Sequence, residues 1–231
     1  MDRQIEQMFS RVAPRYDRLN HLLSLGSDRW WRAGAVAAME GRHVKRLLDL
    51  CCGTGDFGIE FLKQRERGRV TFLDFSTGML EVAQHKLQKK PEWAARSRLV
   101  AADAGHLPFP DDSFDAVVCG FGVRNVGREA ETLIEIKRVL KSGGACVILE
   151  FFQPSTWPAR LFYWTVGTTL IPLAGWLVSG DLGAYRYLTR SATRYMRLDE
   201  FMVLMETIGF RRVEGRHIAA GVAALVHARR P

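Results

Sequence analysis

The chain has 231 residues, of which 47% are hydrophobic and 25% are charged, and its formal net charge is +8 at pH 7. This composition excludes collagen-like and disordered chains, and the length suffices for one substantial core, so we expect a single domain over residues 1–231. The basic excess permits an anionic partner such as nucleic acid or an acidic lipid surface, but the Lys and Arg residues are dispersed, which favours ordinary solvated charge.

The N-terminal segment, residues 1–43, is predicted to be a helical cap on this domain. Residues 5–40 read as two or three short helices, and Asp28 is placed to cap the helix that begins at "DRWWRAGAVAAM". The opening "MDRQIEQMFSRVAPRYDR" is too polar to contain the apolar core of a signal peptide, which predicts a cytoplasmic protein.

From Val44 onward, short apolar runs alternate with helical patterns. The runs predicted as strands are "RLLDL" (46–50), "VTFLDF" (70–75), "SRLVAAD" (97–103), "FDAVVCGF" (114–121) and "GGACVILEF" (143–151). The predicted helices cover residues 55–66, 78–89 and 127–141. This alternation is typical of a parallel sheet flanked by helices.

The pattern changes near the C-terminus. The run "EFMVLMETIGF" (200–210) predicts a helix that ends at Gly209. The runs "RRVEGRHI" (211–218) and "VAALVHA" (222–228) predict consecutive strands around the turn-prone "AAG". The predicted fold is therefore α/β and Rossmann-like, with a mostly parallel seven-stranded sheet closed by an antiparallel C-terminal hairpin.

Residues 153–190 interrupt the alternation. Within them, "LFYWTVGTTLIPLAGWLVSG" (161–180) holds 20 residues without a charge, which is close to the length that spans a membrane. Gly167 and Pro172 dilute the stretch, and a span would separate the final hairpin from the sheet it must join, so we exclude it. Two interpretations remain: a helical insertion packed on the domain, or an apolar lid over a hydrophobic substrate or membrane surface.

The cysteines show no sign of a metal site. Cys51, Cys52, Cys119 and Cys146 have neither zinc-ligand spacing nor a C-x-x-C pair, and most of them lie in or beside predicted strands. We therefore expect buried, reduced thiols and no bound metal.

The turn in "LLDLCCGTGDFGIEF" (47–61) raises the question of which cofactor it holds, because Gly53, Gly55 and Gly58 satisfy the dinucleotide pattern G-x-G-x-x-G. A pyrophosphate needs the turn's N–H groups free of competing negative charge. Here Asp49 and Asp56 bracket the turn, which disfavours phosphates and favours a ligand with cationic groups, such as a sulfonium and an ammonium.

Two further acids end the next strands. Asp74 lies about 20 residues beyond the turn, where a carboxylate accepts ribose hydroxyls. Asp103, with the Ala104 N–H beside it, is placed to contact an adenine. Because ligands bind at the carboxyl edge of such sheets, three acids at successive strand ends predict S-adenosylmethionine as cofactor in preference to NAD.

Several motifs in this order resemble one family. They are "RYDRLNHLLSLG", "LLDLCCGTGDF", "FLDFSTGML", "DAGHLPFPDDSFD", "GFGVRNV" and "RVLKSGG". Together they are similar to the class I S-adenosylmethionine-dependent methyltransferases, and specifically to the ubiquinone/menaquinone-biosynthesis C-methyltransferases. The resemblance covers nearly the whole chain, and "RYDRLNHLLSLG" with "GVRNV" is its specific part.

The resemblance implies a set of cofactor contacts. The expected cofactor-binding residues are Asp49, Gly53, Thr54, Gly55, Asp74, Asp103, Ala104 and Gly120. Gly120 stands where some relatives have a serine, so it offers no side-chain contact, and in "YRYLTRSATRYM" the tail departs from the family's pattern.

The resemblance also implies the reaction, methyl transfer to a ring carbon of a prenylated quinol, either demethylmenaquinol or the ubiquinone precursor. Such a carbon becomes nucleophilic when a neighbouring hydroxyl loses its proton, so the site needs a base or a group that stabilises the phenolate. Arg124 with Asn125 and, from the N-terminal cap, Tyr16 with Asp17 are the candidate catalytic residues. The alternatives are that Arg124 pairs with a structural carboxylate, that Asn125 caps the following helix, and that Tyr16 and Asp17 only pack.

A prenyl tail accounts for the charge-free residues 161–180, and basic residues would assist docking on anionic lipid at the inner face of the membrane. The remaining alternatives are a methyltransferase for another lipid or small molecule and, less favoured, one for RNA, because the chain has no clustered basic stripe. The sequence leaves the ring type and the oligomeric state open.

Overall fold

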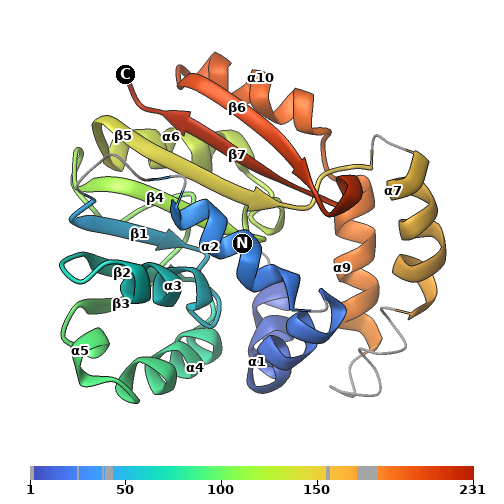
Figure 1. Cartoon of the computed structure of the whole chain (residues 1–231), viewed down its shortest axis with the longest axis horizontal. Coiled ribbons are helices and arrows are strands. Elements are labelled where there is room, and N and C mark those ends of the chain that lie inside the picture. The colour runs from blue at the N-terminus through green and yellow to red at the C-terminus, as the bar shows by residue number, and fades with distance from the viewer. Residues whose placement is uncertain (1–2, 25, 38, 40–43, 155–156, 171–181) are drawn as a thin grey trace.

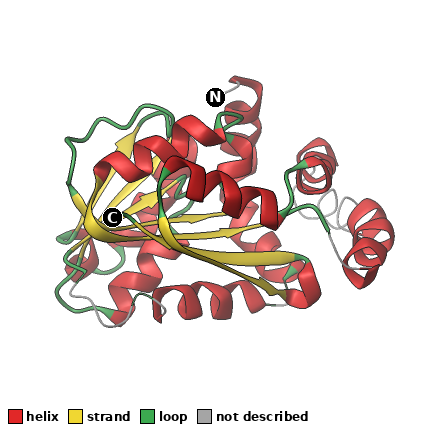
Figure 2. Ribbon diagram, turned by 90° about the horizontal axis from the view of Figure 1, so that it is seen from above, coloured by secondary structure: helices red, strands yellow, loops and turns green. Residues whose placement is uncertain are grey.

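A computed structural model describes residues 3–24, 26–37, 39, 44–154, 157–170 and 182–231. These residues form one seven-stranded sheet with helices on both faces (Figures 1 and 2). The strands are β1 (Arg46–Leu50), β2 (Arg69–Asp74), β3 (Ser97–Ala101), β4 (Phe114–Gly120), β5 (Leu140–Glu150), β6 (Arg211–Ile218) and β7 (Ala223–Arg229).

The helices before the insertion are α1 (Arg3–Leu23), α2 (Ser27–Ala37), α3 (Asp56–Gln64), α4 (Thr77–Gln88), α5 (Pro91–Ala94), the 3₁₀ turn η1 (Val123–Asn125) and α6 (Glu129–Val139). Those that follow are α7 (Trp157–Phe162), the π-helical η2 (Tyr163–Leu170), α9 (Leu182–Arg194), α10 (Leu198–Ile208) and the 3₁₀ turn η3 (Ala219–Gly221).

The strand order is β3-β2-β1-β4-β5-β7-β6. Strands β1 to β5 pair in parallel, whereas β7 is antiparallel to both β5 and β6. The predicted fold, a mostly parallel seven-stranded sheet closed by an antiparallel hairpin, is confirmed. From β1 the chain adds β2 and β3 on one side of the sheet and then β4 and β5 on the other, so the strand order reverses between β1 and β4. In α/β proteins, ligands bind in the crevice at the carboxyl ends of the strands beside such a point.

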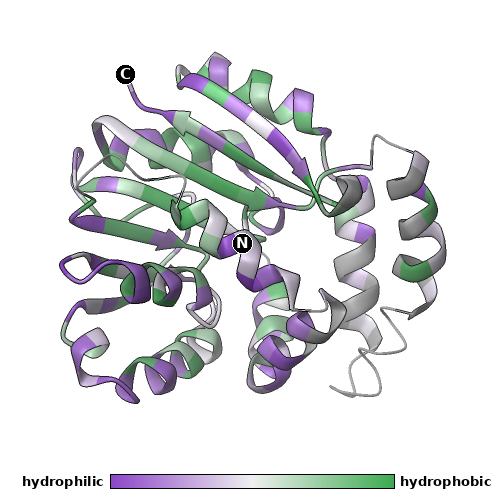
Figure 3. Cartoon of the chain, in the orientation of Figure 1, coloured by the Kyte–Doolittle hydropathy of each residue, from purple (hydrophilic) through white to green (hydrophobic). Residues whose placement is uncertain are grey.

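Buried apolar residues on both faces explain why the central strands read as continuous hydrophobic runs. Leu48 of β1 faces a cluster shared with α6 and α10, whereas the adjacent Leu47 faces a cluster shared with α2, α3 and α4. This alternation follows from the two-residue period of a strand. Figure 3 shows hydrophobic residues along β4 and β5 and more hydrophilic ones along the edge strand β6.

The N-terminal cap differs from the prediction of two or three short helices. Helix α1 is 21 residues long and continues through Pro14. Val12 and Ala13 are buried against Met79 of α4, and this packing offsets the backbone hydrogen bond that proline removes. Asp28 is not the cap of α2 but lies inside its first turn, with its side chain buried.

The junction of α6 and β5 also differs, because a helix was predicted to residue 141 and a strand from residue 143. Helix α6 ends at Val139, and β5 begins at Leu140, which pairs with Phe114. The pairing register then shifts between Phe114 and Ala116, which accommodates the "KSGG" segment within the strand.

The described part of the insertion is helical, as predicted. Figure 1 shows α7 and α9 at the side of the sheet, with α9 nearer to α1. Residues 171–181 of the charge-free stretch lie outside the described residues. Of the helices that the structure describes, none is long and apolar enough to cross a membrane. The four cysteines are free thiols, as predicted, and all but Cys51 are buried.

Candidate active site

A cleft of about 830 Å³ opens at the carboxyl ends of β1, β2 and β4. The predicted site residues that line it are Tyr16, Asp49, Gly53, Thr54, Asp74, Asp103, Ala104, Gly120 and Asn125. Asp17, Gly55 and Arg124 lie next to lining residues without lining the cleft themselves.

The glycine turn connects β1 to α3 and forms one wall of this cleft. Gly55 has a φ of 83°, a left-handed conformation that favours glycine, and it directly precedes α3. A Cβ on Gly58 would lie 2.3 Å from Cε1 of Phe72, so only glycine lets α3 approach β2 this closely. The sequence pattern therefore reflects local packing, whichever ligand the turn binds.

Asp49, at the end of β1, is buried and only half satisfied. Its Oδ2 accepts a hydrogen bond of 2.8 Å from the Gly58 N–H, whereas its Oδ1 is buried and accepts from none of the residues that the structure describes. Burial raises the pKa of this carboxyl group to about 7. Because Asp49 also lines the cleft, its free oxygen is an acceptor for a donor group on a ligand.

Asp74 organises the other side of the turn. Its Oδ2 accepts from the Gly53 N–H at 2.8 Å, and its Oδ1 accepts from the Ser76 N–H at 2.9 Å. Burial raises the pKa of Asp74 although these N–H groups oppose the shift. Each carboxylate oxygen keeps a second lone pair, with which it can accept from a sugar hydroxyl.

The same hydrogen bonds argue against a dinucleotide. The N–H groups of Gly53 and Gly58 are already bonded to Asp74 and Asp49, so they are not available to a pyrophosphate. A buried acceptor without a donor instead suits a ligand with an ammonium group and ribose hydroxyls. The residues present therefore fit S-adenosylmethionine.

Asp103 and Ala104 follow β3 at the far end of the cleft. Asp103 Oδ1 accepts from the Gly105 N–H at 2.8 Å, and Oδ2 pairs with Arg128 Nη2 at 2.6 Å. Ala104 is buried. Gly120 ends β4, and a Cβ there would lie 3.0 Å from the Phe57 ring, which accounts for glycine in place of a larger residue.

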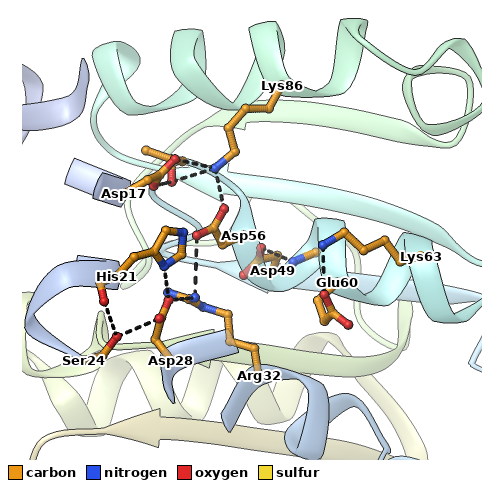
Figure 4. A network of polar contacts seen from close by, with 12 residues as sticks. Asp17, His21, Ser24, Asp28, Arg32, Asp49, Asp56, Glu60, Lys63 and Lys86 are labelled. Carbon is orange, nitrogen blue, oxygen red and sulfur yellow. Dashed lines mark hydrogen bonds and ion pairs between the residues drawn. The ribbon is translucent and has the colours of Figure 1, made fainter. Parts of the chain in front are cut away.

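A network of polar contacts ties α1 and α4 to the glycine turn (Figure 4). Asp17 accepts hydrogen bonds from the Thr54 hydroxyl and, at 2.8 Å, from Lys86 Nζ. Lys86 also pairs with Asp56 and donates to Thr54 Oγ1 at 3.2 Å. The lysine thus joins one carboxylate from α1 to another at the start of α3.

The network continues into α2. Arg32 Nη1 lies 2.5 Å from Asp28 Oδ2 and 3.6 Å from Asp56 Oδ2. His21 Nδ1 lies 2.8 Å from the same oxygen of Asp28. Burial alone would raise the pKa of Asp28, but hydrogen bonds from Ser24 and His21 hold it below its ordinary value. His21, Asp28 and Asp56 lie close enough together to hold a metal ion. Arg32 already balances the charge of both carboxylates, so the three residues do not need one.

These contacts correct one expectation about charge. Asp49 and Asp56 were both expected to present negative charge beside the turn. Lys86 and Arg32 neutralise Asp56, and the raised pKa of Asp49 leaves it partly protonated near pH 7. The expected preference of this turn for a cationic ligand therefore depends on the free oxygen of Asp49 more than on the summed negative charge of the two acids.

Arg124 lies in η1 and forms a buried ion pair with Glu150 at the end of β5. Its Nη1 is 2.5 Å from Glu150 Oε1 and donates to the Phe121 carbonyl at 2.8 Å. The backbone N–H of Arg124 donates to Glu150 Oε2 at 3.3 Å. Burial raises the pKa of Glu150 although the guanidinium opposes this shift. The structure thus has the pairing with a buried carboxylate that was the alternative for Arg124.

Asn125 lines the cleft and does not cap a helix, because the N-cap of α6 is Arg128. Its Nδ2 donates to the Phe121 carbonyl at 3.1 Å, and its Oδ1 accepts from the Tyr187 hydroxyl at 3.1 Å. Tyr16 lines the same cleft, and burial raises the pKa of its hydroxyl. The structure therefore brings an amide and a phenol to the cavity wall.

Sequence reasoning missed three residues of this arrangement, namely Arg32, Lys86 and Glu150. Glu150 had a detectable signal, since it ends a predicted strand at the same sheet edge as Asp49 and Asp74. Lys86 and Arg32 had none, because their partners come from other helices.

The comparisons identify the family. A sequence model of the ubiE/COQ5 methyltransferase family matches residues 1–230. The chain belongs to this family. The predicted resemblance and enzyme class are therefore confirmed, whereas the roles of individual site residues stay predictions.

Two relatives match over almost the whole chain. The demethylmenaquinone methyltransferase of Thermus thermophilus is 41% identical over 97% of this chain and 100% of its own length. The ubiquinone/menaquinone biosynthesis C-methyltransferase UbiE of Geobacter sulfurreducens is 40% identical over 96% of this chain and 86% of its own length. Both relatives are named for quinone biosynthesis or for demethylmenaquinone methylation.

The fold also has solved counterparts. The structure is similar to that of the [4+2]-cyclase SpnF, with a TM-score of 0.74 and 17% sequence identity. The superposition covers 99% of this chain and 96% of SpnF. This likeness shows the fold alone, since one fold serves several reactions.

Proposed function

We propose that this chain transfers a methyl group from S-adenosylmethionine to a ring carbon of a prenylated quinol. The match to a methyltransferase family over residues 1–230, with relatives named for menaquinone and ubiquinone biosynthesis, carries the proposal. The cleft at the carboxyl edge of the sheet supports it.

The residues that would hold the cofactor are those whose oxygen atoms can still accept hydrogen bonds. The unpartnered Asp49 Oδ1 would accept from the ammonium group, and Asp74 would accept from the ribose hydroxyls. Thr54, Gly53 and Gly55 shape the turn beside it, and the segment Asp103–Ala104 would border the adenine. When bound, S-adenosylmethionine supplies an electrophilic methyl group on a positively charged sulfur.

The acceptor carbon of the quinol must become nucleophilic, and loss of a proton from a neighbouring hydroxyl achieves this without a metal ion. Once a ring hydroxyl has lost its proton to water, the neighbouring carbon is nucleophilic and would take the methyl group that S-adenosylmethionine would supply, with S-adenosylhomocysteine as the leaving product, and the ring would then release the proton of that carbon. Asn125 and Tyr16 line the cleft and would contact the ring oxygen. Arg124 is next to Asn125 in the chain and does not line the cleft. Because Glu150 balances its charge, Arg124 would stabilise the phenolate only over a short distance.

The prenyl tail would leave the cleft towards the insertion. Trp157, Leu161 and Trp164 are exposed there, and Trp157 and Trp164 are 72% and 75% accessible. Arg160 and Arg194 are exposed on α7 and α9 of the same region. Interfacial tryptophans with basic neighbours suit an anionic lipid surface, so we assign to α7 and η2 a peripheral membrane contact and to residues 153–190 the role of a lid.

The direct test is methylation in vitro. The protein is incubated with labelled S-adenosylmethionine and a short-chain demethylmenaquinol, or its benzoquinol counterpart, and the product mass is determined. We expect one added methyl group on a ring carbon of at least one quinol. Methylation of a phospholipid amine or of RNA, with neither quinol modified, would contradict the proposal.

A further inference from the structure

Helix α9 contacts both residues of the Arg124–Asn125 pair, although it is distant from them in sequence. The Tyr187 hydroxyl donates to Asn125 Oδ1 at 3.1 Å, and Ser191 Oγ accepts from Arg124 Nε at 3.3 Å. Tyr187 and Ser191 are four residues apart, so they lie on one face of the helix. The face of α9 that meets η1 is thus polar at these positions.

The Phe121 carbonyl and the Tyr187 hydroxyl together hold the Asn125 amide: the carbonyl decides which end of the amide faces it, and the hydroxyl anchors the other end. The Phe121 carbonyl can only accept, so the amide must present Nδ2 to it, and Oδ1 must face the tyrosine hydroxyl. A flipped amide would place two acceptors together at Phe121. Held in this way, Asn125 keeps one N–H and one lone pair at the cleft that it lines.

The two contacts are not equally important. Arg124 is already held by Glu150 and by the Phe121 carbonyl, so the Ser191 hydroxyl adds little to its position. Among the residues that the structure describes, Tyr187 is the single donor to Asn125 Oδ1. Packing does not explain that hydroxyl, because a phenylalanine would cover the same apolar surface.

We infer that Tyr187 is a positioning residue for the methyl transfer, which holds the Asn125 amide in the orientation that receives the ring oxygen of the quinol. This inference rests on the proposed function and adds to it a residue of the insertion that acts on the acceptor side alone. Tyr187 does not line the cleft, so it acts through Asn125.

Tyr187→Phe tests this in the full-length protein. Loss of one hydroxyl hydrogen bond is expected to lower kcat about five- to tenfold while KM for S-adenosylmethionine stays unchanged. The matched control is Thr207→Val on α10, because it also removes one hydroxyl hydrogen bond, of 2.8 Å to the Val203 carbonyl, in a helix outside the cleft and the insertion. The control should keep kcat within about twofold of wild type.

A double-mutant cycle with Asn125→Ala separates positioning from general structure. If Tyr187 acts through Asn125, adding Tyr187→Phe to Asn125→Ala lowers kcat no further. Full additivity, or a single variant with wild-type kcat, would overturn the inference while the wild-type enzyme still methylates quinol. A wild-type protein without quinol methylation would instead overturn the proposed function.

Discussion

Asp49 and Gly58 are joined by a 2.8 Å hydrogen bond that ties the end of β1 to the first turn of α3, and it occupies only one oxygen of a buried carboxyl group. The other oxygen is buried and has no hydrogen-bond partner among the described residues, and Asp49 lines the cleft. In the ligand-free protein such a group costs stability, and this cost is what we expect of the ligand-binding role proposed for Asp49.

Asp49→Asn should therefore stabilise the ligand-free protein at alkaline pH. Burial raises the pKa of Asp49 from 3.8 to about 7, so the folded state keeps a proton that the unfolded chain releases, and the free energy of unfolding falls as pH rises from about 4 to 7. The variant cannot ionise, and we expect an advantage on the order of a few kcal/mol at pH 8 that vanishes near pH 4. Urea denaturation at both pH values measures it; an advantage independent of pH would contradict the assignment.

The same substitution should weaken cofactor binding. An amide cannot match the charge that Asp49 offers to an ammonium group, so we expect calorimetry at pH 7.5 to give at least about tenfold weaker binding of S-adenosylmethionine. Unchanged affinity would show that Asp49 does not contact the cofactor.

Gly58→Ala should destabilise the fold. Its Cβ would lie 2.3 Å from the Phe72 ring, so α3 or β2 must shift, at a cost of about 1–3 kcal/mol in the free energy of unfolding. Gly34→Ala in α2 is the matched control, because nothing lies within 4 Å of its added Cβ, and it should stabilise by about 0.5–1 kcal/mol. Denaturant unfolding of the two variants compares them directly, and equal effects would argue against the close packing.

Lys86→Met should loosen α1 from the glycine turn. The substitution leaves Asp17 and Asp56 without their shared cation, and repulsion between these carboxylates then favours separation of α1 from α3. We expect faster hydrogen exchange in α1 and a lower affinity for S-adenosylmethionine. Lys63→Met is the control, since the Lys63–Glu60 pair lies on the surface of α3, and exchange in α1 should not change.

Glu150→Gln should destabilise the protein by about 3–5 kcal/mol, because it leaves the Arg124 guanidinium buried without a counter-ion. The double variant with Arg124→Met should recover much of this loss in urea denaturation while it binds S-adenosylmethionine and methylates quinol more slowly than wild type. A double variant as unstable as Glu150→Gln, or fully active, would contradict these roles.

Simultaneous Trp157→Ala and Trp164→Ala should weaken binding to vesicles that contain anionic phospholipid, as measured by sedimentation. Trp30→Ala is the control, because Trp30 is equally exposed but lies on α2, away from the insertion. Equal losses in both proteins, or none, would place the membrane contact elsewhere.

The sequence was sufficient to predict the sheet but less so the helical cap. Buried apolar runs specify the central strands because each is covered on both faces, and the exposed edge strand β6 was predicted from its place before the turn-prone "AAG". The length of α1 was not, because Pro14 indicates a break, whereas burial of Val12 and Ala13 against α4 outweighs that local preference. Similarly, "KSGG" indicates a turn, but pairing with β4 draws it into β5.

For the site, the residues on strand ends were predictable and the long-range ion pairs were not. The position of Asp49 and Asp74 follows from the strand pattern alone. Which cation meets which carboxylate depends on the packing of separate helices, so the Lys86 bridge and the Arg124–Glu150 pair had to come from the structure.

The reversal of strand order between β1 and β4 separates the proposed donor-binding residues from the proposed acceptor-binding residues. The half built on β1, β2 and β3 carries the acids proposed for the methyl donor, whereas β4, β5 and the insertion carry Asn125 and its support from Tyr187. If the proposed roles are correct, exchanges in the insertion should change acceptor preference and leave donor affinity unchanged. Such modularity makes residues 153–190 the natural segment to transplant when a different ring is to be methylated.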